Sequence, residues 1–450
     1  MRVSTADRTK AITPAELRQP VDGLHDRMWG AGEYTNWMDE SLSWKETCYL
    51  GDWSFIRERR FLGPDVLKLF SDISVNSVEN FQVGQSKHMI QCNPQGKIIH
   101  EGVVSRFGEQ ELVAFSSSAV LAEYVLSQGG YDVTVEEIDW TNYHVQGPNA
   151  LHVLERAAGE PLRDIQFMRF RKATIAGHEV TFLRQGMSGE IGFELQTPRE
   201  HGREVYEAIL AAGEDFGIRR MGGRVALINH LEACYPTIGL DYLPAVFDTW
   251  ASDYLRTFKQ EMPFLFDIAM KVAGSFDSDD VSGWYRSPVE LGWGRNIKFD
   301  HDFVGRDALA QELENPKRTI VTLVWNAADV EDVYASLLRK DEQPYDIMEM
   351  PRDRRGYVYA SRVLINDQDV GISTSRGYSA YFREMLSLCV IDIEHSKPGT
   401  EVVVVWGEPG HRQKQIRAVV APAPYKPNNA RADLNSLPML LSQTPGRQAA

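Results

Sequence analysis

A glutamate in a glycine-rich stretch is the strongest candidate for ligand chemistry. The stretch runs Leu183-Arg-Gln-Gly-Met-Ser-Gly-Glu-Ile-Gly-Phe-Glu-Leu195, a turn followed by a short alternating pattern. Alternation places the apolar side chains of a strand on one face and Glu194 on the other, and Gly192 is expected to leave open space beside the carboxylate. A buried carboxylate can bind a planar edge with two adjacent N–H donors, such as that of a pterin. The alternative is a solvated glutamate on an exposed strand face.

A second candidate is the adjacent pair His100-Glu101, which follows a strand pattern beginning at Lys97. A histidine can donate a proton or a hydrogen bond to a leaving oxygen near neutral pH, which an ordinary aspartate cannot. We therefore expect proton transfer here. The alternative is a strand-end pair that faces water.

Aromatic residues crowd into residues 29–53. Flat side chains stack well on a flat ligand, each pair contributing about 0.5–1.5 kcal/mol beyond area burial. The alternative for most of them is a place in a core or a dimer interface, and whether the segment acts as a lid stays open. The residues are Trp29, Tyr34, Trp37, Trp44, Tyr49 and Trp53.

Composition limits the classes of function. The chain has 450 residues, 43% of them hydrophobic, which is enough for two or three domains. A formal net charge of −15 gives no overall basic field to attract nucleic acid or an anionic membrane. The sequence has no signal-peptide pattern and no run near the roughly 20 apolar residues of a membrane span, so we predict a cytoplasmic protein. The four cysteines lack zinc-ligand spacing, and we expect buried, reduced thiols and no metal.

The elements that would position these residues are antiparallel strands with helices between them. Residues 81–116 predict an antiparallel meander, and residues 199–216 have apolar side chains at helical spacing. We expect an α+β fold. Further strand patterns lie at 319–325, 357–366, 384–393 and 401–406.

Several phrases resemble the aminomethyltransferase (glycine-cleavage T-protein) superfamily. Gly186–Leu195 resembles its "TGE-GFE" signature, in which the second glutamate holds the pterin of tetrahydrofolate. Gly222–Ala233 resembles its glutamate-containing helix, and Leu291–Leu309 matches a segment that positions a helix. The resemblance runs from about Asn36 to Tyr425. It implies a T-protein-like, multi-lobed fold with antiparallel sheets around a folate site and a C-terminal β-barrel.

The resemblance also implies a division into four parts. Residues 1–265 would form the folate-binding module with its aromatic N-terminal segment, and 266–318 a connecting lobe. Residues 319–430 would form the β-barrel, and 431–450 a polar tail.

One branch of the superfamily fits better than the T-proteins proper. Thr35–Trp37, Phe299–Leu309, Thr322–Asn326 and Arg417–Tyr425 look like segments of the tetrahydrofolate-dependent aryl O-demethylases of the vanillate/3-O-methylgallate and syringate type. Such an enzyme would move the methyl of an aryl methyl ether to N5 of tetrahydrofolate, giving 5-methyltetrahydrofolate and a phenol. The implied ligands are tetrahydrofolate and a methoxylated aromatic compound. The oligomeric state stays open.

The resemblance assigns roles to individual residues. His100-Glu101 stands where T-proteins have two aspartates, one of them near the reactive nitrogen of folate. The leaving phenolate, with a conjugate-acid pKa of about 10, needs stabilisation. The catalytic candidates are His100, Glu101 and Tyr242. The folate-binding candidates are Glu194, Glu190, Tyr235 and Glu232. The substrate-binding candidates are Trp29, Tyr34, Trp53, Arg106, Ser117 and Ala226. Glu232 could instead stabilise the fold.

Several residues expected to contact the methyl donor differ from those of the aryl O-demethylases. Ser116-Ser117-Ser118 stands where vanillate-type relatives have an arginine, Ala226 where they have a tyrosine, and Phe55-Ile56 where they have two histidines. A bulkier or halogenated methoxyarene, or one without the vanillate carboxylate geometry, fits these changes.

Two alternatives to an aryl O-demethylase remain. One is a demethylase of an N-methyl or S-methyl compound, for which the aromatic segment could form a cage around a cation. The other is a folate-binding relative without catalysis.

Overall fold

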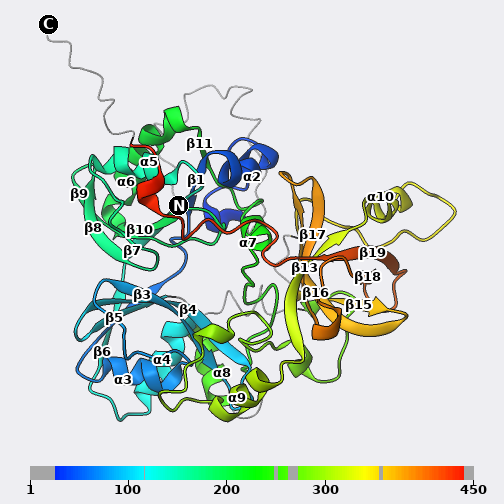
Figure 1. Cartoon of the computed structure of the whole chain (residues 1–450), viewed down its shortest axis with the longest axis horizontal. Coiled ribbons are helices and arrows are strands. Elements are labelled where there is room, and N and C mark those ends of the chain that lie inside the picture. The colour runs from blue at the N-terminus through cyan, green and yellow to red at the C-terminus, as the bar shows by residue number, and fades with distance from the viewer. Residues whose placement is uncertain (1–25, 116, 248–251, 262–271, 354–357, 440–450) are drawn as a thin grey trace, which may run out of the picture.

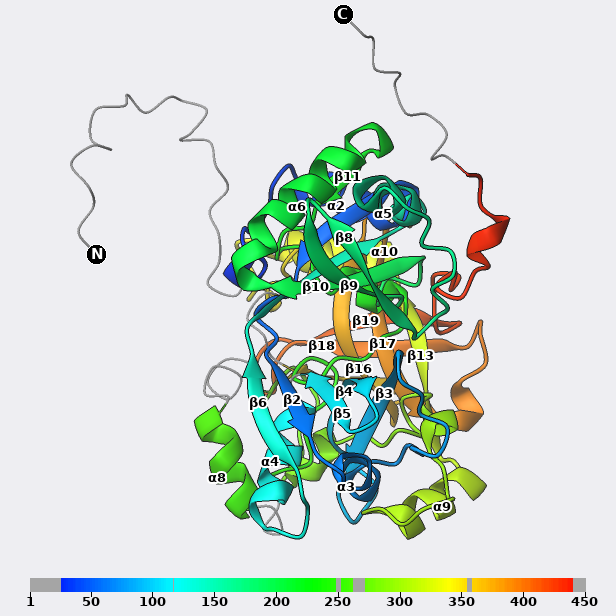
Figure 2. The same ribbon diagram turned by 90° about the vertical axis from the view of Figure 1, so that its left-hand side faces the viewer.

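Three lobes meet around a common centre (Figure 1). The computed structural model describes residues 26–115, 117–247, 252–261, 272–353 and 358–439. A view turned by 90° shows the two N-terminal sheets one above the other (Figure 2). Residues far apart in the sequence can therefore contribute to one site.

The first lobe is a six-stranded sheet of order β11-β1-β7-β10-β9-β8. Its strands are β1 (Cys48–Asp52), β7 (Trp140–Gln146), β8 (Phe170–Ile175), β9 (His178–Leu183), β10 (Gly192–Pro198) and β11 (Ile218–Arg220). Helices α5 (Ala150–Ala158) and α6 (Arg199–Gly213) cover one face, where Phe193 and Leu195 are buried with Val205 and Ile209. The predicted strand around Glu194 and the predicted helix at 199–216 are confirmed.

The expected open space at Gly192 is wrong. A Cβ built on Gly192 would lie 2.7 Å from Cγ of Gln146, its partner on β7. Oε1 of Gln146 accepts a hydrogen bond from the Ser188 N–H at 3.0 Å. The glycine therefore makes room for a side chain of the protein, not for a ligand.

The second lobe is a five-stranded sheet of order β3-β4-β5-β2-β6. Its strands are β2 (Glu58–Leu62), β3 (Gln85–Cys92), β4 (Ile98–Gly108), β5 (Glu111–Phe115) and β6 (Thr134–Ile138). Helices α3 (Val66–Ile73), α4 (Ser117–Ser127) and α8 (Ser252–Glu261) lie on the side away from the first lobe (Figure 1). Met89 and Val104 pack with Leu69 and Phe70 of α3 on that side. The predicted antiparallel meander is confirmed, and the opposite face of β3 and β4 is left for the centre of the molecule.

The third lobe is a closed barrel of order β13-β17-β16-β15-β18-β19, which confirms the predicted fold class. Its strands are β13 (Arg318–Trp325), β15 (Ser361–Ile365), β16 (Gln368–Ser379), β17 (Glu384–Asp392), β18 (Glu401–Trp406) and β19 (Lys414–Ala421). The remaining elements include α2 (Trp37–Glu46), α7 (Ile228–Glu232), α9 (Arg306–Glu314), α10 (Ala327–Ser336), β12 (Val272–Ala273), β14 (Val358–Tyr359) and six short 3-10 turns. Within the described ranges, no helix has the length and apolar character needed to span a bilayer.

After β19 the chain crosses back from the barrel to the first lobe. The Asn429 N–H donates to the Gly189 carbonyl at 2.7 Å. Leu434, in the segment predicted as a tail, is only 1% exposed. Residues 440–450 of that tail, and residues 262–271 around the predicted end of the folate-binding module, lie outside the described residues. The crossing brings the C-terminal segment to the centre of the molecule.

Candidate active site

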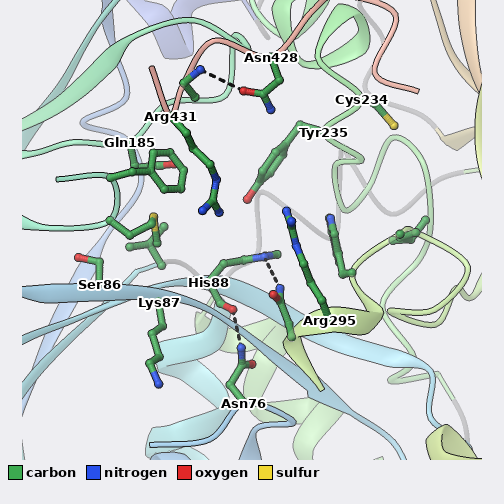
Figure 3. Close-up of a pocket in the computed structure, with 18 of the residues that line it drawn as sticks. Asn76, Ser86, Lys87, His88, Gln185, Cys234, Tyr235, Arg295, Asn428 and Arg431 are labelled. Carbon is green, nitrogen blue, oxygen red and sulfur yellow. Dashed lines mark hydrogen bonds between the residues drawn. The ribbon is translucent and has the colours of Figure 1, made fainter. Parts of the chain in front are cut away.

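A cavity of about 950 Å³ lies where the lobes meet. Figure 3 shows side chains from distant segments converging on this space. Its volume is at the upper end of the usual range for small-molecule sites. The wall is formed by β3 and by residues within 167–168, 185–186, 233–235, 291–300 and 423–431.

A histidine paired with a carboxylate lines the cavity. Nε2 of His88, on β3, donates a hydrogen bond to Oε2 of Glu101, on β4, at 2.6 Å. The antiparallel register sets His88 opposite Val103 and Ile90 opposite Glu101, so the four side chains share one face. Nδ1 of His88 lies 3.5 Å from Nδ2 of Asn296. Glu101 is thus one hydrogen bond behind the wall, and His88 is the group that meets a ligand.

His88, Tyr235 and Trp293 form an aromatic wall. The ring centroids of His88 and Trp293 are 4.8 Å apart at 87°, and Tyr235 lies 6.0 Å from His88 and 6.1 Å from Trp293. Such contacts hold rings in fixed orientations against which another ring can stack. Burial, reinforced by the charges of Glu101 and Glu194, raises the pKa of Tyr235 well above its usual value. Its hydroxyl therefore stays protonated.

Glu194 is buried, as predicted, and is 3% exposed. It accepts a hydrogen bond from Nε2 of Gln185, which lines the cavity. Nε2 of His144 lies 3.4 Å from Glu194 Oε1, and the His144 ring stacks on Trp53 at 4.2 Å. Burial raises the pKa of Glu194 to about 8 and lowers that of His144 to about 3. The histidine is therefore neutral, and Gln185 separates Glu194 from the cavity.

Glu190 binds other parts of the protein. Its carboxylate lies 3.1 Å from Nζ of Lys426, and both oxygens accept hydrogen bonds from Nδ2 of Asn429 at 3.1 Å. The Lys426 ammonium, which is 0% exposed, also donates to the Ser188 carbonyl at 2.8 Å. The signature glutamate thus anchors the C-terminal segment on the first lobe.

Glu232 is also occupied by protein groups. It accepts hydrogen bonds from Nε1 of Trp44 at 2.8 Å and from Oγ of Ser379 at 2.5 Å. Trp44 belongs to α2 and Ser379 to the barrel strand β16. These contacts favour the structural alternative for Glu232, because the carboxylate joins two lobes and does not line the cavity.

His100 and Tyr242 lie behind the cavity wall. His100 is on the opposite face of β4 from Glu101, where Nε2 is 2.5 Å from the Tyr254 hydroxyl and the ring lies 4.7 Å from Phe258. Burial lowers the pKa of His100 to about 3. The Tyr242 hydroxyl is buried without a hydrogen-bond partner among the described residues. Burial and the charge of Glu101 raise its pKa well above the usual value, so it keeps its proton.

The predicted substrate residues do not come together at the cavity. Trp29, Trp53 and Ala226 pack in one buried cluster with Tyr49 of β1. Tyr34 is half-buried, with the Arg220 guanidinium 3.9 Å from its ring centroid. The aromatic segment reaches the site only indirectly, because Trp53 stacks on the histidine beside the buried signature carboxylate.

The other two substrate candidates lie in the second lobe. Arg106 donates to the carbonyls of Phe81, Gly108 and Glu109, which fix it at a hairpin. Ser117 is the first residue of α4, and its side chain lies outside the described part of the chain. Both roles stay predictions.

The residues that line the cavity were missed by reasoning from the sequence. His88 faces Glu101 across a predicted hairpin, so the hairpin register could have indicated it. Gln185 lies within the glycine-rich stretch itself. Nothing local marks Arg295 or Arg431, because their proximity depends on how the lobes assemble. Within the described residues, no group of three or more His, Cys, Asp or Glu side chains is placed to hold a metal ion.

Known proteins are similar to this chain in sequence. Residues 27–246 match the family described as the GCVT N-terminal domain. A sesamin methylene transferase from Sinomonas sp. is 37% identical over 432 residues, which cover 90% of this chain and 93% of the relative. A syringate O-demethylase from Sphingobium sp. is 31% identical over 418 residues, covering 87% and 89%.

The fold also matches a solved structure. The aminomethyltransferase T of the glycine cleavage system from Bartonella henselae superposes with a TM-score of 0.64 at 19% identity, covering 89% of this chain and 92% of that one. At this identity the match concerns the fold alone. Together with the sequence matches it confirms the resemblance, and the chain belongs to the aminomethyltransferase (glycine-cleavage T-protein-like) superfamily of one-carbon-transferring enzymes.

Proposed function

We propose that this protein is a tetrahydrofolate-dependent O-demethylase that transfers the methyl group of a methoxylated aromatic compound to N5 of tetrahydrofolate. The observation that carries the proposal is the His88–Glu101 pair at a cavity that also holds an aromatic wall and the Gln185–Glu194 hydrogen bond. The similarity to a syringate O-demethylase supports an aryl ether as the methyl donor.

The wall of the cavity fits a reduced folate. Glu194 already accepts an amide N–H, which is the chemistry that the paired N–H donors of a pterin require. We assign Gln185 as the side chain that gives up this position to the ligand. When bound, tetrahydrofolate would supply the nitrogen that accepts the carbon. A cavity of about 950 Å³ leaves room for a small arene beside it.

His88 is the group best placed to move a proton. A leaving aryl oxide has a conjugate-acid pKa of about 10, so its negative charge must be stabilised or protonated as the C–O bond breaks. His88 would carry the proton lost by the accepting nitrogen to the oxygen of the departing phenol. Glu101 would hold the imidazole in orientation and stabilise its cationic form through the 2.6 Å hydrogen bond.

Tyr242 does not line the cavity, so the predicted role as donor to developing negative charge requires a bound ligand to reach past the wall to its buried hydroxyl. Its pKa, raised well above the usual value by burial and by Glu101, keeps the hydroxyl protonated. A buried hydroxyl without a partner carries a desolvation cost that a ligand oxygen could relieve.

A second donor class is favoured by the similarity to a sesamin methylene transferase, whose name describes transfer of a methylene group. A methylenedioxy bridge joins two aryl oxygens through one carbon. Its transfer would break two C–O bonds and form C–N bonds to N5 and N10 of tetrahydrofolate. The proton lost by each nitrogen would pass to a catechol oxygen. N-methyl and S-methyl cations are less well supported, because the cavity lining is rich in lysine and arginine.

The test is an anaerobic incubation with tetrahydrofolate and four groups of donors. These are carbon-13-labelled methoxybenzoates and methoxyphenols, methylenedioxybenzenes, and betaines. Mass spectrometry should find labelled 5-methyltetrahydrofolate and a phenol from a methoxyarene. Formation of 5,10-methylenetetrahydrofolate and a catechol would favour the second donor class. Product from betaines alone, or from no donor, would contradict the cleavage of an aryl ether.

A further inference from the structure

The cavity is basic although the chain is acidic. The formal net charge of the chain is −15. The charged residues of the cavity wall are four bases and one acid, namely Lys87, Arg295, Lys298, Arg431 and Asp300. Lys87 is engaged with the Ser77 carbonyl at 2.6 Å. Across the described residues, no ion pair neutralises Arg295, Lys298 or Arg431. Their charge is available to an anionic group of a ligand.

Arg295 and Arg431 reach into the cavity from different parts of the chain. Figure 3 shows Arg431 extending toward the cavity from the C-terminal segment and Arg295 extending toward it from the opposite side. The Arg431 guanidinium lies 4.4 Å from the ring centroid of Phe167. Guanidinium groups bind carboxylates through two parallel hydrogen bonds. Two that converge without an acidic partner therefore form a site for a carboxylate.

A continuous wall connects this site to Glu194. Gln185 donates to Glu194, and the Met168 N–H donates at 2.8 Å to the carbonyl of the residue before Gln185. Phe167 follows, with Arg431 over its ring. The wall thus presents a carboxylate, a flat apolar side chain and a guanidinium in that order. A reduced folate presents paired N–H donors, a benzoyl ring and a glutamate in the same order.

We propose that Arg295 and Arg431 form a carboxylate clamp for the glutamyl end of tetrahydrofolate, and that Lys298 extends the clamp to further glutamates of a polyglutamylated folate. This rests on the proposed function, because it takes folate as the ligand of Glu194. All three basic side chains are exposed, as binding of a tail of variable length requires. Glu190 is a positioning residue for the clamp, since it binds Asn429, two residues before Arg431.

Isothermal titration calorimetry with three unreactive ligands tests the clamp. The ligands are 5-formyltetrahydropteroate, which lacks glutamate, and 5-formyltetrahydrofolate with one or three glutamates. For the wild-type protein we expect the affinity to rise about tenfold with the first glutamate and further with three. Higher salt should reduce this gain. In the Arg295→Gln/Arg431→Gln variant, the three ligands should bind equally, close to the wild-type affinity for the pteroate.

The matched control is Arg203→Gln, which changes an exposed arginine of α6 that pairs with Glu207 at 2.8 Å. It should keep the wild-type dependence on glutamate. Equal binding of the three ligands to the wild-type protein would overturn the clamp and leave the proposed function standing. No binding of any of them would overturn both. If the double variant kept its folate affinities but raised KM for methoxybenzoates and not for methoxyphenols, the arginines would bind the substrate carboxylate and the clamp would be overturned.

Discussion

Glu190 and Glu194 belong to one signature, yet protein groups bind both oxygens of Glu190 and only Oε1 of Glu194. Glu190 pairs with the buried ammonium of Lys426, and both its oxygens accept from Asn429. Glu194 accepts one hydrogen bond, from a side chain of the cavity wall. Its neighbour His144 is uncharged, because burial lowers the pKa of that ring to about 3.

The difference shows that a matched signature does not give its residues equal roles. A buried carboxylate whose two oxygens are both bound by protein groups from a distant segment holds that segment in place. Burial instead raises the pKa of Glu194 to about 8. Such an incompletely compensated group beside a cavity is typical of a binding site. The same contrast separates Glu101, which reaches the cavity through His88, from Glu232, which joins two lobes.

Among the residues compared, the largest loss of reaction rate is expected for His88, which lines the cavity. His88→Asn keeps a polar side chain but removes the imidazole. Since a positioned acid or base contributes about 10²–10⁴ to a rate, single-turnover methyl transfer should slow by a similar factor. The affinity for 5-formyltetrahydrofolate should stay near the wild-type value. A rate close to that of the wild type would remove His88 from the chemistry.

Lys426→Met tests whether the pair formed by Glu190 and Lys426 stabilises the fold. The substitution leaves Glu190 buried without its cation, and breaking a buried pair from one side costs about 3–5 kcal/mol. Urea unfolding should report a loss of stability of that order. Adding Glu190→Gln to the same chain should recover part of the loss, because the unpaired charge is removed. Wild-type stability of the single variant would show that the pair does not hold the C-terminal segment.

The raised pKa of Glu194 predicts how stability and folate affinity should change with pH. Its pKa is raised from 4.5 to about 8 by burial. The stability that it contributes is therefore fully present below about pH 4.5 and is lost as the pH rises through about 8. A ligand with N–H donors prefers the ionised form. Folate affinity should therefore rise by up to about tenfold per pH unit and level off above about 8. A flat profile for the wild-type protein would contradict the assignment.

The smallest change in kcat is expected for substitution of His100. His100→Gln keeps a polar partner for Tyr254 on the helix-covered face of β4. Because that face does not contact the cavity, kcat should remain within about twofold of the wild-type value, well short of the change expected for loss of an acid–base group. A fall comparable to that of His88→Asn would return His100 to the chemistry.

The position of Glu194 on its strand could be predicted from the sequence, but the residues that surround it could not. Alternation in β10 depends on neighbouring residues alone, so the face that carries Glu194 was predictable. Its burial was indicated only by the resemblance to the T-protein signature. The space beside it was not predictable, because Gln146 comes from a strand paired through the sheet. Alternation also predicts that His100 and Glu101 lie on opposite faces of β4. It does not predict which of these faces the helices cover, so it could not tell which of the two residues lies toward the cavity.

The remaining parts of the site depend on long-range assembly. Arg431 reaches the cavity because the chain crosses back from the barrel and is fixed by Lys426 and Asn429. Trp53 packs in a core cluster and touches the site only through His144. No local pattern records either outcome.

The most direct test compares Glu194→Gln with Glu190→Gln, each assayed for 5-formyltetrahydrofolate affinity and for unfolding midpoint. Hydrogen bonds to a charged group contribute about 1.5–3 kcal/mol. Glu194→Gln should therefore weaken folate binding by about 10- to 100-fold, with a midpoint no lower than that of the wild type. Glu190→Gln should lower the midpoint, and its loss of folate affinity should be confined to the part that depends on glutamate. Undiminished folate binding by Glu194→Gln would contradict the account.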